Sequence, residues 1–196
     1  MQILRFADLV VSRWKNGGGT TREYLVHPPG AGTGDFYWRV SRAEVVKHGA
    51  FSLFPDVDRT LTVVAGGTID LLFADRRIRL DRTTPPYAFR GDVHVECRIP
   101  GEPIEDLNVM TRRGHWCSQV VRHTVDATTP FDLTGNRNLI IAVDAARVRF
   151  SGADPVDLGP GDAIDSDAAS NVAIEPVEAS AEILVVRLDH LARSRG

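Results

Sequence analysis

Polar and apolar residues alternate with a period of two in short segments along most of the chain. These segments are rich in β-branched and aromatic residues, and nearly every gap between them holds turn-forming residues. Alternation of this kind predicts strands that bury one face and expose the other. Strands are expected at residues 36–46, 60–65, 68–73, 93–99, 105–111, 117–123, 139–143, 147–150 and 182–188.

Long apolar stretches at helical spacing are absent from the sequence. At most a short helix is expected near the start of the chain, in the segment FADLVVSRW. The chain is therefore predicted to be all-β, of the sandwich or barrel type.

Two segments of the chain repeat the same order of features. Residues 61–92 run through a strand, a turn and two strands to a closing Gly-Asp, and residues 139–162 do the same in a shorter copy. Gly-Asp closings are common in cupin barrels, which are jelly rolls. We therefore predict a bicupin, with a first cupin-like barrel at residues 1–122 and a second, smaller one at residues 123–196. The barrels could exchange strands, and residues 123–138, low in strand character, would connect them.

Composition and charge exclude several classes of partner. The net charge is −3 and no basic block stands out, so neither nucleic acid nor a membrane surface is expected as a partner. Arg5 and Asp8 interrupt the N-terminal apolar residues, which argues against a secretory signal or an anchor. Cys97 and Cys117 form no CxxC motif and are expected to be free thiols in a cytoplasmic protein.

The residues that would build a metal centre are missing from the first predicted barrel. Cupin enzymes usually hold a metal with an HxH pair and a Glu a few residues later, because residues two apart on a strand face the same side. The corresponding residues 49–67 contain no histidine, and Arg59 stands about where that pattern carries its Glu. His94 and Glu96 share a strand face, but a third ligand would have to come from elsewhere in the fold. We expect no metal and no cofactor.

The sequence WKNGGGTTREY, residues 14–24, places three glycines before a polar segment. A phosphate loop has its Lys after the glycines and leads into a helix, whereas here the Lys precedes them and a strand is expected to follow. The Trp, Arg and Tyr flanks are also unlike a flexible linker. The glycines predict a tight turn or a close approach of the backbone to another segment or a ligand. Thr21 and Glu23 would then share one strand face, with Arg22 and Tyr24 on the other.

Arginines occur within otherwise apolar strands. Alternation places Arg39 and Ser41 on one face of a strand and Trp38 on the other. Because a buried guanidinium is unstable without a partner, several arginines in a barrel predict carboxylate partners, either the protein's own or a ligand's. For a single Arg, the alternative is plain solvation or an internal ion pair, such as Arg22 or Arg39 with Glu23 or Glu44. The set as a whole predicts a small anionic or amide-rich ligand.

With these residues in view, the chain resembles the HutD/Ves family, which is found with bacterial histidine-utilisation genes. The matching words are WKNGGGTTRE, DFYWRVSRAEV, GAFSLFPDVDRTLTVVAGG, PYAFRGD and DLNVMTRR, in the family's order and across most of residues 11–113. The resemblance implies a two-barrel cupin fold without a bound metal and without a firmly established catalytic activity. It also implies a regulatory role in histidine breakdown through binding of an intermediate, formylglutamate or formimidoylglutamate.

The resemblance further implies a set of ligand-binding residues in the first barrel. The positions that match the family's words are Asn16, Thr21, Arg22, Glu23, Trp38, Arg39, Ser41, Ser52, Phe54, Arg59, Asn108, Met110 and Arg112. In the main hypothesis, arginines bind the ligand's carboxylates, Asn, Ser or Thr meet its formyl or formimidoyl end, and Trp38 or Phe54 form apolar walls.

Two other hypotheses remain open. The chain could be a metal-independent hydrolase or isomerase acting on the same intermediates, with Glu23 as the general base. It could instead be an interaction protein with a vestigial pocket. Exposed sheet edges also leave a homodimer open.

Overall fold

A computed structural model describes residues 1–14, 17–167 and 169–191. In these ranges the one helix is a 3₁₀ turn, η1 (Phe6–Asp8), and the other elements are strands. No helix among the described residues is long and apolar enough to cross a membrane. The chain separates into two compact units. The boundary between them was predicted from the sequence to lie between residues 122 and 123. The larger unit contains Val10–Cys117 and Leu191, and the smaller unit contains Met1–Leu9 and Ser118–His190.

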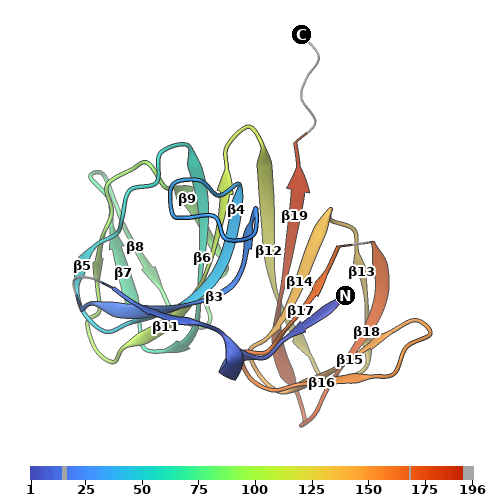
Figure 1. The fold of residues 1–196 in the computed structure, drawn as a ribbon. Coiled ribbons are helices and arrows are strands. Elements are labelled where there is room, and N and C mark those ends of the chain that lie inside the picture. Colours follow the sequence, from blue (N-terminus) through green and yellow to red (C-terminus); the bar gives the residue numbers. More distant parts are fainter. Residues whose placement is uncertain (15–16, 168, 192–196) are drawn as a thin grey trace. The chain divides into compact units, whose positions relative to one another are not determined.

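The larger unit consists of two antiparallel sheets (Figure 1). The order in its six-stranded sheet is β2 (Val11–Arg13), β3 (Gly19–His27), β4 (Trp38–Val45), β11 (Ile104–Arg112), β6 (Val57–Gly66) and β9 (Tyr87–Arg90). The order in its four-stranded sheet is β5 (Gly49–Ala50), β10 (Glu96–Arg98), β7 (Ile69–Leu72) and β8 (Arg77–Leu80).

Both sheets contribute to the core of the larger unit. Leu61 and Val63 of β6 pack in one cluster with Ile69 and Leu71 of β7, and all four are almost completely buried. Alternate residues of a strand point to the same face, so the face of β6 that carries Leu61 and Val63 also carries Arg59. The face of β6 that builds the core therefore also carries a cation.

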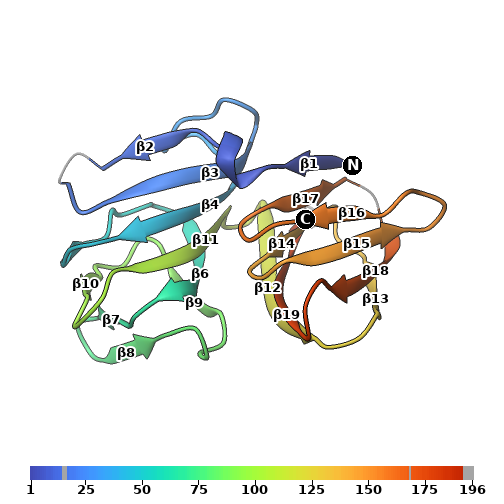
Figure 2. The ribbon, with the colours of Figure 1, turned by 90° about the horizontal axis from the view of Figure 1, so that it is seen from below.

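The smaller unit is also made of two antiparallel sheets, and its core lies between them. Its five-stranded sheet has the order β1 (Gln2–Leu4), β17 (Ala163–Ser166), β14 (Arg137–Ala142), β19 (Ala181–His190) and β12 (Trp116–Val125). Its four-stranded sheet has the order β13 (Thr129–Leu133), β18 (Ser170–Pro176), β15 (Ala146–Phe150) and β16 (Val156–Leu158). Figure 2 shows β1 beside β17, so the first residues of the chain complete a sheet built mainly from its last third.

The all-β prediction is confirmed, and each strand expected from alternation overlaps an observed strand. One local prediction was wrong. The proposed connection at residues 123–138 contains the end of β12 and all of β13, whose Pro130 is tolerated because β13 lies at a sheet edge. In the segment FADLVVSRW, where at most a short helix was expected, only the 3₁₀ turn η1 forms, because Val11–Arg13 pairs with β3. Pairing with the next strand along the chain outweighs a weak and short helical pattern.

A candidate ligand-binding cavity in the larger unit

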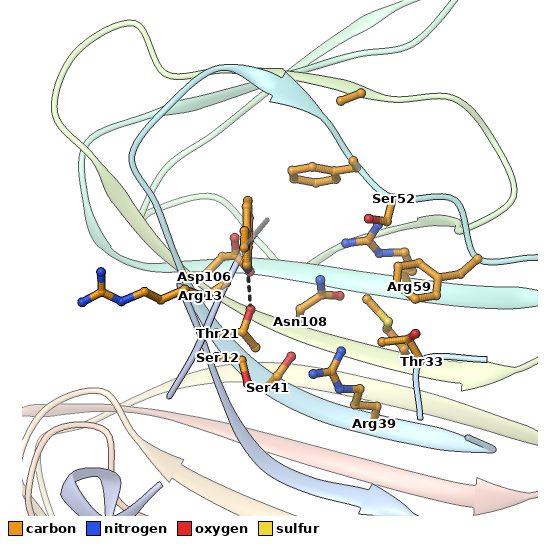
Figure 3. A pocket seen from close by; sticks show the side chains of 16 residues that line it. Ser12, Arg13, Thr21, Thr33, Arg39, Ser41, Ser52, Arg59, Asp106 and Asn108 are labelled. Atoms are coloured by element: carbon orange, nitrogen blue, oxygen red, sulfur yellow. Dashed lines mark hydrogen bonds between the residues drawn. The ribbon is translucent and has the colours of Figure 1, made fainter. Parts of the chain in front are cut away.

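The larger unit contains a cavity of about 470 Å³ on the inner face of its six-stranded sheet (Figure 3). Strands β2, β3, β4, β6 and β11 contribute to its lining, together with the segment between β5 and β6. The lining residues are Ser12, Arg13, Trp14, Thr21, Thr33, Arg39, Ser41, Ala43, Ala50, Phe51, Ser52, Phe54, Arg59, Asp106, Asn108 and Met110.

Strand register brings the first row of lining residues together. Ser12 lies opposite Thr21, Thr21 opposite Ala43, and Ala43 opposite Asp106. Directly opposed residues of an antiparallel pair point to the same face. Strands β2, β3 and β4, which follow one another in the sequence, and the distant strand β11 therefore present one row of side chains at this end of the cavity.

A second row lies further along the same strands. Met110 of β11 is opposite Arg39 of β4 on one side and Arg59 of β6 on the other. The two rows are four residues apart on β11, roughly 13 Å at about 3.3 Å per residue. Asn108 lies between them and is paired with Ser41. The cavity thus has an aspartate at one row and two arginines at the other.

The glycine run positions the first row by allowing the chain to turn from β2 into β3. Gly17 has a φ of +65°, a conformation that glycine adopts without strain. A Cβ on Gly19 would lie 2.1 Å from the carbonyl oxygen of Glu44, so only glycine fits against β4 there. The prediction of a tight turn with a close backbone approach is confirmed. The turn also lets the Trp14 indole N–H donate to the Thr21 hydroxyl at 2.8 Å.

The segment between β5 and β6 covers the arginine end of the cavity. Its backbone is held where the Phe51 N–H donates to the Val95 carbonyl at 2.9 Å and the Phe54 N–H donates to the Gly91 carbonyl at 2.8 Å. Ser52 and Phe54 therefore reach the cavity from a segment whose two ends are anchored.

Arg59 is buried and surrounded by aromatic rings. Its guanidinium carbon lies 5.0 Å from the ring centre of Phe51, 5.5 Å from that of Phe54 and 5.1 Å from that of Phe89. Burial lowers the pKa of Arg59 to about 10, an effect that Asp106 opposes and Arg39 reinforces. Its Nε has no hydrogen-bond partner among the described residues. At neutral pH Arg59 is thus a desolvated cation with an unused donor.

Arg39 differs from Arg59 because the protein provides it with a carboxylate. Its Nε donates to Glu23 Oε2 at 2.6 Å. Glu23 lies in register with Ser41, two residues along β4 from Arg39. The internal ion pair considered from the sequence is therefore present, and it fixes the Arg39 side chain at the cavity.

Asp106 is the one carboxylate among the described residues that line the cavity. Burial raises its pKa to about 7, while Arg59 and Arg42 act in the opposite direction and Glu105 adds to the rise. Its Oδ1 and the Asn108 Oδ1 are buried and have no hydrogen-bond partner among the described residues. Buried polar atoms are normally paired, so these two acceptors mark positions where a bound molecule would donate.

Comparisons with known proteins agree with the family resemblance that the sequence motifs indicated. The family model for HutD matches residues 6–184. The chain belongs to the HutD/Ves family. It is 35% identical over 143 residues to Protein Ves of Citrobacter koseri, across 72% of this chain and 73% of that protein.

Solved structures agree with the family membership. HutD from Pseudomonas fluorescens SBW25 has a TM-score of 0.81 at 28% identity, over 97% of this chain and 99% of that one. A conserved protein of unknown function from Pseudomonas aeruginosa PAO1 has a TM-score of 0.88 at 26% identity, over 96% and 98%. A cupin barrel protein from Leptotrichia buccalis, at 10% identity over 96% of both chains, has a TM-score of 0.62. The predicted cupin fold is confirmed.

The structure brings most of the predicted HutD/Ves site residues into the cavity. Those that line it are Thr21, Arg39, Ser41, Ser52, Phe54, Arg59, Asn108 and Met110. Asn16 lies outside the described residues. Glu23 contributes through its ion pair with Arg39 and is not itself a lining residue.

Three predicted residues of this HutD/Ves set lie elsewhere. Arg22 is in register with Arg42, on the sheet face opposite the cavity. Trp38 is on that same face, stacked on His27 with ring centres 5.5 Å apart, so it does not form the expected apolar wall. Arg112 has the strand parity of the cavity residues but lies at the end of β11, where its guanidinium is held by backbone carbonyls.

Arg112 is expected to act on stability rather than on binding. It donates to the carbonyls of Phe36 at 3.1 Å and Gly34 at 2.8 Å. Arg112→Lys cannot reproduce this fork, so we expect a loss of about 1–2 kcal/mol in the free energy of unfolding, measured in urea. Affinity for a cavity ligand should stay within about twofold of wild type. A large loss of affinity in a folded variant would instead include Arg112 in the site.

Sequence reasoning missed several lining residues of this HutD/Ves chain, above all Asp106. The signal was present, since Asp106 precedes Asn108 by two positions and shares its strand face. Ser12 and Trp14 gave no such signal, because the pairing of β2 with β3 could not be read from the sequence.

His94 and Glu96, considered above as metal ligands, are not part of a metal centre in the described part of this HutD/Ves chain. His94 Nε2 lies 3.7 Å from Glu96 Oε1, and both side chains are more than half exposed. No group of three or more His, Cys, Asp or Glu side chains that could hold a metal occurs in the described ranges.

Proposed function

We propose that the chain binds a small dicarboxylate that carries a formyl or formimidoyl group, such as formylglutamate or formimidoylglutamate, and thereby regulates histidine utilisation in the cytoplasm. The observation that supports it most strongly is Arg59, a buried cation in the cavity whose Nε has no partner among the described residues. A ligand carboxylate would satisfy this donor and neutralise a desolvated charge.

The cavity suits a ligand of this size and polarity. Its volume of about 470 Å³ lies within the range of small-molecule sites. Arg39 stands in the same row as Arg59, so two carboxylates, or the two oxygens of one, would have cationic partners. Met110 and Phe54 form apolar walls beside them. No metal takes part in this proposal.

Arg59→Ala is expected to weaken binding of formylglutamate about 10- to 100-fold, because a charge-assisted contact contributes roughly 1.5–3 kcal/mol. Calorimetric titration of wild type and variant measures the change, with glutamate as the paired ligand control. Unchanged affinity in Arg59→Ala would remove Arg59 from the site. A wild type that gives no heat with either ligand, at concentrations that detect millimolar affinity, would reject the proposed function and favour an interaction protein.

One observation also keeps a metal-independent hydrolase or isomerase as the second candidate. Asp106 has a pKa raised to about 7 by burial, which suits a general base at neutral pH. Glu23, the base considered from the sequence, is instead engaged by Arg39. Turnover of formimidoylglutamate that is abolished in Asp106→Asn would support this candidate, and incubation without any product would reject it.

A further inference from the structure

The cavity is electrically polarised along β11, and its third lining arginine, Arg13 of β2, points away from Asn108 in Figure 3. Asp106 stands at one row, and Arg39 and Arg59 stand at the row of Met110, roughly 13 Å further along the strand. Figure 3 shows Asn108 between Asp106 on one side and Arg59 and Arg39 on the other. A ligand that fits both ends therefore carries an anionic group for the arginines. At some distance from that group it carries a hydrogen-bond donor for Asp106.

The aspartate end offers hydrogen-bond acceptors. Asp106 Oδ1 and Asn108 Oδ1 are both buried without a partner among the described residues, on alternate positions of one strand face. An amide presents either its oxygen or its NH₂ group, so Asn108 adapts to the ligand. An ionised Asp106 only accepts hydrogen bonds. The chemistry at this end is therefore decided by Asp106.

The wall beside Asp106 also suits a flat cation. Thr21 belongs to the row of Asp106, and it accepts a hydrogen bond of 2.8 Å from the Trp14 indole. This bond fixes the orientation of an aromatic ring that lines the cavity. An aromatic face and a carboxylate together stabilise a planar delocalised cation, through cation–π attraction and paired hydrogen bonds.

We infer that the cavity, used as proposed above, selects an amidine over a formyl group: an amidinium donates to Asp106 and Asn108 while the ligand's carboxylates contact Arg39 and Arg59. This inference rests on the proposed function and names its ligand class. A formyl oxygen is an acceptor, so against an ionised Asp106 it would meet a second acceptor and leave both unpaired. Two N–H groups of an amidinium match the two unused acceptors.

The charge of Asp106 depends on nearby charged groups on both faces of the sheet, Arg59 on its own face and Arg42 and Glu105 on the other. Burial raises its pKa to about 7, Arg59 from β6 and Arg42 from β4 oppose the rise, and Glu105 of β11 increases it. Cys97 of β10 has its own pKa raised by burial and, to a lesser extent, by Asp106. Above this range an ionised Asp106 pairs with an amidinium, and below it a protonated Asp106 donates to a formyl oxygen. The two ligands should therefore show opposite pH trends.

The test is a set of calorimetric titrations with formimidoylglutamate, formylglutamate and glutamate at about pH 6 and about pH 8, on either side of the Asp106 pKa. At the higher pH the amidine ligand should bind wild type about 10- to 100-fold more tightly than the formyl ligand. At the lower pH this preference should shrink. The comparison needs no variant and is therefore independent of any effect of mutation on folding.

Two variants locate the preference within the protein. Asp106→Asn should weaken the amidine ligand about 10- to 100-fold at about pH 8 and remove the pH dependence of the preference. The Asn amide donates as a protonated Asp106 does, so the variant should bind the formyl ligand at both pH values as wild type binds it at about pH 6. Asp70→Asn is the matched control, since Asp70 is a buried aspartate of the same unit that does not line the cavity. It should leave both affinities unchanged.

The outcomes separate this inference from the proposed function. Tighter binding of the formyl ligand at both pH values, or equal losses for both ligands in Asp106→Asn, would overturn the amidine preference while leaving the proposed function standing. No binding of either ligand to wild type would reject both.

Discussion

Asp106→Asn is expected to remove a pH dependence of stability between about pH 4 and about pH 7. Burial raises the pKa of Asp106 from its ordinary 3.8 to about 7, so the folded state holds this proton more tightly than the unfolded chain. The associated stability is fully present below the unfolded pKa and is lost as the pH rises through the folded pKa. The slope is at most about 1.4 kcal/mol per pH unit, or a few kcal/mol over the window.

The measurement is the free energy of unfolding in urea across this pH range for wild type and variant. Wild type should lose stability relative to Asp106→Asn as the pH rises. Asp70→Asn is the control, because hydrogen bonds from Arg79 and Arg77 hold the pKa of Asp70 at about 2. The stability that ionised Asp70 contributes is present above its unfolded pKa of 3.8 and is lost as the pH falls through about 2. The difference in unfolding free energy between wild type and Asp70→Asn should therefore be nearly flat from pH 4 to 7. If the stability difference between wild type and Asp106→Asn were equally flat from pH 4 to 7, the pKa of Asp106 in the folded protein would not be raised.

Gly66→Ala is expected to destabilise the protein by at least about 3 kcal/mol, from backbone strain and steric overlap together. Gly66 ends β6 with a φ of +82°, where side chains are strained. A Cβ there would lie 2.1 Å from the Pro103 carbonyl oxygen and 2.9 Å from the Ile104 Cα. Both contacts are to backbone, so no side-chain rotation relieves them. The melting temperature should fall by roughly 6 °C or more.

Substitutions at two other glycines separate the contribution of backbone strain from that of steric overlap. Gly114 has a φ of +77° with open space around it, so Gly114→Ala should lose only about 1 kcal/mol. Gly101 has open space and no positive φ, so Gly101→Ala should stay within about 0.5 kcal/mol of wild type. Similar losses for Gly66→Ala and Gly114→Ala would show that the contact with Pro103 relaxes and that backbone conformation alone sets the loss.

Local alternation predicted the longer strands, such as β4, β6 and β11, and which of their residues share a face, but it did not predict short strands such as β2 and β13. Arg39 shares a face with Ser41, and Asn108 with Met110, in the sequence pattern and in the folded sheet alike. This succeeded because the side-chain period of a strand is a local property that needs no knowledge of its neighbours. The glycine run was readable for the same reason, since backbone conformation at Gly17 is set within a few residues.

The tertiary structure decided which of these faces became a site. Arg59 and Arg112 look alike in the sequence, yet one is left with an unused donor in a cavity and the other is held by carbonyls from Phe36 and Gly34. Asp106 shares a cavity with the arginine row only because β4 and β6 take their register with β11. Register links segments that are distant in the sequence, and a slip of one residue moves every side chain to the other face. The sequence by itself therefore determined the longer strands and which of their residues share a face, whereas the pairing of distant strands determined the charges that meet in the cavity.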